Sequence, residues 1–392
     1  MKILISHFGI KDGGGFGRTF LLALNLSKLG YDATLLTTQK RKSAILYQKE
    51  IRNSVKIIAY NEIIPIKFIN SGYGIISLVG KIIYSLFHKY DVVYSDTGHR
   101  PLAGWPCVVN RFVYSSKYFS EWWDLYARSY INDDGLFKKW FFQYESNSEI
   151  KNRKRADGVV VLSSYMKERA IKLGISSDKI EIVHGGADVD NIAFFDDPEV
   201  IKEKYGFKKG SIVFGFIGIS DQDLEDVEPF ILAINKIKNV NVEWFTTGIG
   251  FSKKAINNYK IDERYHNLGW IDYFIDPEIM SSADIFVLVK KETERNIVGW
   301  PNKLGDYFAL GRPTMITPYG DIKDYIFKHP EMFLVVEHRV KSILDTIENI
   351  PSKLEYLQSQ NKVIREIAEK EYSWFERTKI IANFIKMDKT NV

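Results

Sequence analysis

The stretch that most constrains the fold is residues 296–317, which read NIVGWPNKLGDYFALGRPTMIT. Pro301 suits the first turn of a helix, residues 302–310 contain no proline or β-branched side chain, and Gly311 and Pro313 suit a helix end. Apolar runs at 284–289 and 313–317 predict a strand on either side. A strand, helix and strand in this order predict a parallel α/β sheet, in which the start of the helix lies at the carboxyl edge of the strands.

Two polar side chains of this helix, Lys303 and Asp306, are three residues apart and therefore share a face of its first turn. Free backbone amides at a helix start favour an anion. A cation next to a phosphate, with a carboxylate next to a diol, is what the binding of a nucleoside diphosphate requires. On residue chemistry alone, the alternative is a solvated ion pair.

The same stretch resembles the signature of retaining, nucleotide-sugar-dependent glycosyltransferases of the GT-B fold, the family-four group, in the variant Pro-x-Lys-(Leu/Phe)-x-(Glu/Asp)-Tyr-(Met/Leu)-Ala-x-Gly-(Lys/Arg)-Pro. The resemblance implies that Asp306 binds the ribose hydroxyls of the donor. It also implies that the helix start, with Asn302, Lys303 and Leu304, faces the diphosphate. The usual signature has an earlier Glu, which here falls on Val298, and Glu292 and Glu294 are the nearby substitutes for contact with the donor sugar.

Length and charge bound the remaining possibilities. A chain of 392 residues predicts two domains of roughly 180 residues each. Residues 1–187 carry 27 Lys and Arg against 16 Asp and Glu, a net charge of +11, whereas residues 188–392 carry 27 against 33, a net charge of −6. The basic half favours an anionic lipid surface, and we expect no nucleic-acid partner because no helix-turn-helix, zinc-finger or aromatic RNA-binding motif is visible.

The cysteine count and the hydropathy of the chain predict its cellular compartment. The single cysteine, Cys107, excludes an intramolecular disulfide and makes a cysteine-based metal site unexpected, which predicts a reducing cytoplasm. The apolar window 73–87 contains Lys81 and is too short to span a bilayer, and the start of the chain is not typical of a signal peptide. We therefore expect a cytoplasmic protein with peripheral contact at the inner face of the membrane.

The N-terminal residues predict a βαβ unit with a glycine-rich loop. An apolar run at 2–6 is followed by Gly13, Gly14 and Gly15 and by a helix from Phe16. Glycines without a Cβ let a substrate approach the backbone, and in the family resembled such a loop borders the reaction centre. In the following helix, Arg18 is either a phosphate contact or a solvated residue.

A basic and apolar region follows, from Lys40 to Lys89. We interpret residues 75–87 as a helix packed in the core. Residues 40–52 alternate Lys and Arg with Ile, Leu and Tyr, which is typical either of an interfacial segment that contacts a membrane or of an ordinary surface.

Three residues of the first half are candidates for ordering or deprotonating the acceptor hydroxyl: Asp124, Glu121 and His99. His99 lies just beyond the predicted strand 91–96, where α/β proteins build their sites. Glu121 and Asp124 lie in the sequence EWWD, and the family resembled has an Asp/Glu-Trp-x-Asp segment at this position of its acceptor-facing domain. The alternative is a partly buried capping acid on a helix.

The second half departs from the family resembled after its first strand, in the loop that ends the strand-to-loop stretch 211–220. Family members have Gly-Arg and a later Lys there, which neutralise the donor diphosphate, whereas this chain has Gly218 and Ile219 followed by DQDLEDVE. Gly218 remains a candidate for donor binding. Without the usual cations, the diphosphate would depend on Lys303, on helix starts and on Arg18.

The resemblance as a whole implies an α/β protein of the GT-B fold, with two Rossmann-like, doubly wound parallel-sheet domains facing across a cleft. We expect an acceptor-binding domain at 1–187, a nucleotide-sugar-binding domain at 188–370 and a C-terminal helix at 371–392 that crosses back to the first. The implied reaction moves a sugar, with retention of configuration, to a glycan or lipid-linked acceptor, without a cofactor or metal. A non-catalytic partner subunit of the same shape is the alternative. A Rossmann oxidoreductase is disfavoured because the chain lacks GxGxxG.

Overall fold

The computed structural model describes residues 1–40, 46–63, 72–125, 136–271, 276 and 278–387. The chain forms two compact units. Unit 1 comprises Met1–His184 together with Trp374–Val392, and unit 2 comprises Gly185–Ser373. The first predicted boundary, at 187, lies just beyond His184, and the second, at 370, lies just before Ser373. The last helix, α16 (Trp374–Lys386), belongs to unit 1.

Unit 1 is built on one sheet, which has eight strands among the described residues, in the order β3-β4-β2-β1-β5-β6-β7-β8. The strands are β1 (Lys2–Ile10), β2 (Asp32–Lys40), β3 (Tyr47–Arg52), β4 (Val55–Glu62), β5 (Val92–Ser95), β6 (Lys117–Trp122), β7 (Gly158–Val161) and β8 (Ile180–Ile182). Each neighbouring pair is parallel except β3 and β4, which are antiparallel. The parallel sheet confirms the prediction, and the interfacial segment predicted at 40–52 contains the edge strand β3.

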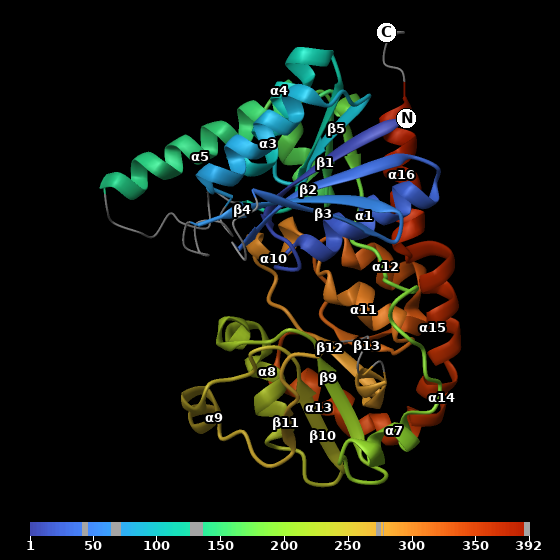
Figure 1. The fold of residues 1–392 in the computed structure, drawn as a ribbon. Helices are drawn as coiled ribbons and strands as arrows, with labels where there is room; N and C mark the ends of the chain where they lie inside the picture. The colour runs from blue at the N-terminus through green and yellow to red at the C-terminus, as the bar shows by residue number, and fades with distance from the viewer. Residues whose placement is uncertain (41–45, 64–71, 126–135, 272–275, 277, 388–392) are drawn as a thin grey trace. The chain divides into compact units, whose positions relative to one another are not determined.

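Helices cover both faces of this sheet (Figure 1). Besides α16, they are α1 (Phe16–Lys28), α3 (Ile75–Phe87), α4 (Pro101–Tyr114), α5 (Leu136–Arg155), α6 (Ser164–Lys172) and the 3-10 turn η2 (Ser177–Lys179). Ile3 and Ile5 of β1 pack in one core with α1 and α16. Ser6, on the opposite face of β1, donates a hydrogen bond to the carbonyl of Leu102 in α4. Alternate residues of one strand thus face different helix layers, as expected of a doubly wound sheet.

Helix α3 has the predicted bounds, but the prediction that it packs its apolar side in the core is wrong. Its buried residues are Ser77, Lys81, Tyr84 and Ser85, whereas most of its large apolar side chains are exposed. The inward polar groups satisfy buried acceptors: Ser77 Oγ donates to Glu62 at 3.0 Å, and Lys81 Nζ donates to the carbonyl of His7 at 2.7 Å. Because an unpaired buried acceptor is costly, these bonds determine which side of the helix turns inward.

Unit 2 contains a second parallel sheet, six-stranded in the part of the chain that the structure describes, in the order β11-β10-β9-β12-β13-β14. Its strands are β9 (Ile212–Phe216), β10 (Val242–Thr246), β11 (Tyr265–Asn267), β12 (Ile285–Leu288), β13 (Thr314–Ile316) and β14 (Phe333–Val335). Its helices are α7 (Pro198–Lys204), α8 (Leu224–Ile234), α9 (Lys253–Tyr259), α10 (Glu294–Val298), α11 (Lys303–Ala309), α12 (Ile322–Lys328), α13 (Val340–Asn349), α14 (Leu354–Ser359) and α15 (Asn361–Ile367). Shorter turns are η3 (Asp221–Asp223), η4 (Ile279–Ser282), η5 (Pro330–Met332), η6 (Ile350–Lys353) and the π-helical η7 (Ala368–Tyr372).

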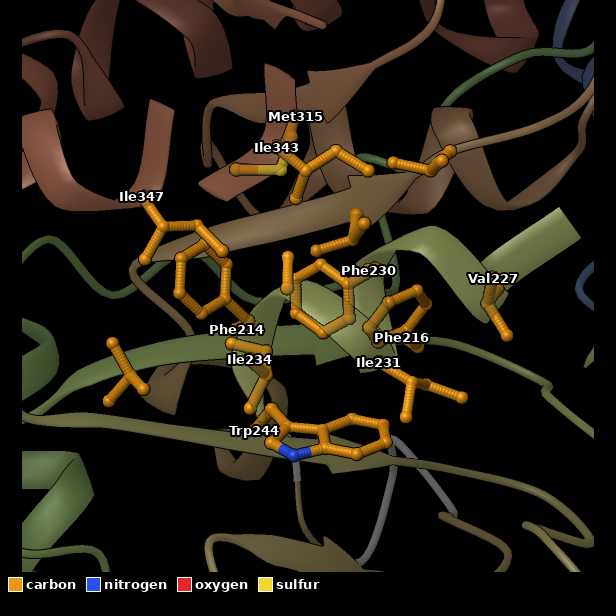
Figure 2. Packing of buried hydrophobic residues seen from close by; sticks show 14 of the residues in the cluster. Phe214, Phe216, Val227, Phe230, Ile231, Ile234, Trp244, Met315, Ile343 and Ile347 are labelled. Atoms are coloured by element: carbon orange, nitrogen blue, oxygen red, sulfur yellow. The ribbon is translucent and has the colours of Figure 1, made fainter. Parts of the chain in front are cut away.

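An aromatic core lies between one face of this sheet and helices α8 and α13 (Figure 2). Phe230 of α8 contacts Phe214 and Trp244 edge to face, with ring centroids 5.5 and 5.8 Å apart. Such pairs contribute about 0.5–1.5 kcal/mol each beyond their buried area. Phe286 of β12 points to the opposite face and stacks on Tyr307 of α11, with centroids 4.2 Å apart. The contact fixes α11 against the sheet.

The predicted helix of the 296–317 stretch is confirmed as α11, between β12 and β13. It ends two residues before Gly311, whose φ of 64° is the left-handed conformation that glycine adopts without strain. The next residue, Arg312, is fully buried and donates to the carbonyls of Ala283 and Ser281 at 2.8 and 3.0 Å. Arg312 therefore has a structural role that ties the end of α11 to the segment that precedes β12.

Candidate functional site

Candidate donor-site residues of unit 2 gather where three elements end or begin. Strand β9 leads to Gly218, whose φ is 61°, strand β12 leads to Lys290, and α11 starts at Lys303. Lys303 Nζ donates to the carbonyl of Gly218 at 3.4 Å, which joins the first and last of these elements. A Cβ at Gly218 would meet open space, so the backbone there is accessible to a ligand. We call these residues, with Asp306, the unit 2 site.

Asp306 lies half-buried in the first turn of α11. Burial, together with repulsion from Asp188, raises the pKa of its carboxyl group to about 7, and the Lys303 ammonium opposes both effects. A carboxylate that has lost much of its water is a strong acceptor for hydroxyl groups that replace that water. The carboxylate of Asp306 is therefore better placed to accept hydrogen bonds from a diol than to stay hydrated.

Lys303 is also half-buried, so the solvated ion pair considered from the sequence is not what the structure shows. Burial lowers the pKa of its ammonium group, the carboxylate of Asp223 raises it, and the neighbouring charge of Lys290 lowers it. Two cations that repel each other in a partly desolvated place favour an anion that would contact both.

The first turn of α11 offers fewer free amides than expected. Helix α11 has only seven residues, and the amides of Leu304 and Gly305 already donate to the carbonyls of Pro301 and Asn302 at 3.0 Å. The side chain of Leu304 is fully buried, whereas Asn302 is exposed. The groups of this turn that can face an anion are therefore those of Asn302 and Lys303.

Lys290 is a site residue that the sequence interpretation missed. Its Nζ lies 3.5 Å from Asp226 Oδ2 and 3.3 Å from Asn296 Oδ1, and its side chain is 22 % exposed. Its backbone is held by Thr317, which accepts from Lys290 N at 2.8 Å and donates to Lys290 O at 2.7 Å. The signal in the sequence was its position directly after the buried strand 284–289, at the carboxyl edge of the sheet.

The two acids suggested for sugar contact are exposed. Glu292 pairs with Lys323 at 2.8 Å, and Glu294 lies in the first turn of α10. Neither position is fixed by burial, and both stay predictions for the donor sugar.

In unit 1, the glycine-rich loop lies against an aromatic ring. Gly15 has a φ of 78°, and a Cβ there would stand 2.8 Å from the ring of Trp123. A Cβ at Gly14 would instead meet open space. The loop therefore packs on one side and leaves backbone accessible on the other, next to the EWWD segment.

Arg18 and Glu121 form a buried ion pair between α1 and β6. Arg18 Nε donates to Glu121 Oε1 at 3.0 Å, and a second guanidinium nitrogen contacts the same oxygen. The guanidinium also lies over the rings of Trp374 and Trp123, at 4.9 and 5.8 Å from the centroids. Arg18 is only 8 % exposed, so the alternative of a solvated residue is wrong. Glu121 lies in a strand, which also removes the alternative of a capping acid on a helix.

Asp124 and His99 differ in exposure. Asp124 is exposed just beyond β6, with its Oδ1 accepting from the amide of Leu125 at 2.7 Å. His99 is 3 % exposed, and its Nδ1 lies 3.2 Å from a guanidinium nitrogen of Arg153. Burial, followed by Arg153 and Arg100, holds the pKa of His99 well below its usual value, so a neutral imidazole lines the cavity of about 380 Å³ between α4 and α5. This environment suits an ordering group better than a base.

A buried polar cluster that sequence interpretation missed lies under the glycine-rich loop. His7 Nδ1 contacts Asp96, Thr19 Oγ1 donates to Asp96 Oδ2 at 2.9 Å, and the amide of Phe8 donates to Asp96 Oδ1 at 3.2 Å. Lys81 supports it through the carbonyl of His7, and burial lowers the pKa of Lys81 to about 7. His7 follows the predicted strand 2–6 and Asp96 is the last residue of the predicted strand 91–96, which was the available signal.

Within the described ranges, no three His, Cys, Asp or Glu side chains come together as a group that could hold a metal ion.

Two family models match the chain. Residues 13–191 match the model described as Glycosyltransferase Family 4, and residues 211–352 match the model described as Glycosyl transferases group 1. A comparison with curated proteins gave no match by sequence.

Solved structures of the GT-B fold resemble the whole chain. Sucrose-phosphate synthase from Thermosynechococcus elongatus has 14 % identity and a TM-score of 0.73, with 97 % of each chain covered. HepE from Anabaena, in complex with UDP-glucose, has 12 % identity and a TM-score of 0.67, with 98 % of each chain covered. WaaG, a glycosyltransferase involved in lipopolysaccharide biosynthesis, has 12 % identity and a TM-score of 0.67, with 99 % of this chain and 100 % of the other covered. The likeness shows the GT-B fold.

Proposed function

Because the chain belongs to the glycosyltransferases of the GT-B fold, we propose that it moves a sugar from a nucleoside diphosphate to an acceptor hydroxyl with retention of configuration. The unit 2 site is the donor site in this proposal. The observation that carries it is the convergence of Lys290, Lys303 and Asp306 at the carboxyl ends of β9 and β12. Nucleotide sugars are also the ligands named for two similar structures, HepE with UDP-glucose and an Escherichia coli structure with UDP-2-fluoro glucose.

The chemical step separates the sugar C1 from the β-phosphate oxygen, and positive charge develops on the ring while negative charge develops on the diphosphate. Lys303 and Lys290 stabilise that diphosphate, since both ammonium groups are partly shielded from water, where electrostatic stabilisation is stronger than in bulk solvent. The departing phosphate oxygen accepts the acceptor's proton. Asp306 holds the ribose, and no metal or cofactor takes part in this scheme.

The acceptor side of the proposal assigns different tasks to the candidates of unit 1. Exposed Asp124 contacts the acceptor hydroxyl, and the buried pair of Glu121 with Arg18 keeps the end of β6 in place. Neutral His99 orders the neighbouring segment. The net charge of +11 in residues 1–187 supports a lipid-linked or membrane-proximal glycan, such as one of an envelope polysaccharide, as the acceptor.

A second candidate is a non-catalytic subunit of the same fold. The observation in its favour is the segment after β9, where Ile219 is 3 % exposed and five carboxylates follow within residues 221–228, those of Asp221, Asp223, Glu225, Asp226 and Glu228. The family resemblance implies cationic side chains at this position. This chain lacks them, so it either binds the donor through Lys290 and Lys303 or has lost turnover.

Calorimetric titration with UDP-, GDP- and ADP-sugars, followed by a donor-turnover assay, separates these candidates. We expect one donor to bind, and its turnover to persist in the presence of a chelator. Binding without hydrolysis or transfer would favour the non-catalytic subunit. If none of the nucleotides bound, the assignment of the unit 2 site would be overturned.

A further inference from the structure

The outer surface of α3 and its neighbours is apolar and has no partner in the described fold. Ile75, Ile76, Val79, Ile83 and Phe87 are 38–77 % exposed and recur at the spacing of one helix face. The opposite face is the polar one that bonds to Glu62 and His7. A helix of a soluble fold normally has the reverse arrangement, so the apolar side requires another explanation.

The end of α4 adds to this surface. Tyr114 OH donates to the carbonyl of Leu86 at 2.6 Å, so the C-terminal ends of α3 and α4 lie side by side (Figure 1). Phe112 and Val113, in the same turn of α4, are 89 and 44 % exposed. Neither helix contains an Asp or Glu. We call the exposed apolar residues of α3 and of this turn of α4 the α3 face.

A basic cavity adjoins the α3 face. It has a volume of about 220 Å³ and lies between α3 and the sheet-edge strands β3 and β4. Its polar lining includes Lys49, Lys56 and His88, and none of the described residues that line it is acidic. Ile83 and Phe87 belong both to its wall and to the α3 face. The cavity has room for about seven waters at ~30 Å³ each, which is enough for a phosphate group.

The cavity is held open by contacts among its own residues. Lys56 Nζ donates to Tyr84 OH at 3.2 Å, and the ring of His88 stacks on that of Tyr84 with centroids 3.9 Å apart. Tyr47 of β3 packs on Tyr60 of β4 at 5.3 Å. These contacts place the two lysines on a rigid sheet edge.

We propose that unit 1 docks on a membrane through the α3 face, with its apolar side chains in the lipid and the phosphate of an anionic lipid in the adjoining basic cavity. Among the described residues, none of the helices combines the length and the hydropathy of a transmembrane span. The α3 helix, about 20 Å long at 1.5 Å per residue, would lie in the plane of the interface. The inference goes beyond sugar transfer, and it rests on the proposed function only in placing the acceptor at the same membrane.

Charge argues for a bilayer and against a second copy of this chain. A symmetric dimer through the α3 face would bring Lys49 and Lys56 near their own counterparts, and like charges across an interface are unfavourable. An anionic headgroup next to acyl chains instead complements both the cations and the apolar side chains.

Vesicle cosedimentation of the full chain tests the inference. One set of vesicles is phosphatidylcholine alone, and the other is two parts phosphatidylcholine to one part phosphatidylglycerol. We expect the parent to bind the second set at least tenfold more tightly, with an affinity that falls as salt is added.

Two double variants separate the apolar and ionic parts. Ile83→Gln with Phe87→Gln removes apolar contact, and we expect at least a tenfold loss of affinity for the anionic vesicles. Lys49→Gln with Lys56→Gln should lower the affinity for the same vesicles about 30-fold, at roughly 1 kcal/mol for each lysine near the surface. Matched controls are Phe327→Gln, at a residue of unit 2 that is 90 % exposed, and Lys172→Gln, on α6 with a side chain 80 % exposed. Both controls should bind like the parent.

Three results would overturn the inference. The parent does not bind anionic vesicles, both double variants bind as the parent does, or the parent is a dimer in solution that Ile83→Gln with Phe87→Gln converts to a monomer. Nucleotide titration of the same preparations keeps the proposals apart. Vesicle binding without nucleotide binding would refute the proposed donor site and support the docking face. Nucleotide binding without vesicle binding would support the donor site and refute the docking face.

Discussion

The substitution Asp306→Asn should make the protein more stable and a poorer nucleotide binder. Asp306 is half-buried, and its folded-state pKa of about 7 lies well above the value of 3.8 for a free side chain. The unfolded chain therefore ionises first. The stability that the protonated carboxyl contributes is fully present below about pH 4 and is lost as the pH rises through about 7. Asparagine has a similar shape and does not ionise, so the variant keeps its folding stability where the parent loses it as the pH rises.

The size of the effect follows from the shift in pKa. Three pKa units correspond to about 4 kcal/mol at 1.36 kcal/mol each. Since part of the side chain still contacts water, which screens the charge, we expect roughly 1–2 kcal/mol above about pH 7.5. For a unit of this size, 1 kcal/mol corresponds to about 2–4 °C in Tm. Asp306→Asn should thus raise the melting temperature of unit 2 by about 2–8 °C near pH 8.

Thermal unfolding at several pH values measures this gain, which should shrink as the pH falls and disappear below about pH 4. Calorimetric titration of the same variant should show an affinity for the nucleotide that is at least tenfold lower, because two ribose hydroxyl groups lose a charged acceptor. Asp345→Asn, at an exposed carboxylate on α13, is the matched control and should change neither quantity. A variant that melts at the parent's temperature near pH 8, or binds nucleotide as tightly, would refute the reasoning.

Three further predictions concern other residues. Lys290→Ala should lower the affinity for a nucleoside diphosphate about tenfold, measured by calorimetry, and leave the affinity for the nucleoside unchanged. Lys291→Ala, at the exposed neighbouring residue, should leave both affinities unchanged; equal losses in the two variants would contradict the donor role of Lys290. Asp124→Asn should lower turnover with donor affinity retained, and because Asp124 is exposed its melting temperature should stay that of the parent; a loss confined to donor affinity would argue against an acceptor role. Lys81→Met should flatten stability between about pH 7 and pH 10. Because the folded-state pKa of Lys81 is lowered, the parent's stability rises across this range by up to about 1.4 kcal/mol per pH unit, and urea unfolding that shows the same slope in both proteins would show that Lys81 is not the cause.

Backbone elements were the most predictable feature, as α11 shows. Its end was set by Gly311 and Pro313, and its start by Pro301, through restrictions on φ that act within a few residues. The buried strands after which Gly218, Lys290 and Asp96 follow were also recognisable, because apolar runs bounded by turn residues are local patterns. The position of candidate residues at the carboxyl edge of each sheet followed from this order of elements.

The surroundings of side chains were less predictable. Arg18 was open to two interpretations, and its buried partner Glu121 lies 103 residues away in the chain. Lys290 was overlooked because its neighbours Asp226 and Asn296 come from separate elements. The ionisation of Asp306 depends on burial and on Asp188, neither of which is visible in the local signature.

The sequence by itself determined the alternation of strands and helices and the two parallel sheets, since periodicity, glycine and proline act over a few residues. The family came instead from the resemblance of residues 296–317 to a known signature. Only the tertiary structure decided which side of α3 faces solvent. That helix has an apolar side that would normally turn inward, but Lys81 meets the carbonyl of His7, 74 residues before it, and Ser77 meets Glu62. Buried polar groups must be paired, and their partners are brought into place by the fold and not by the neighbouring sequence.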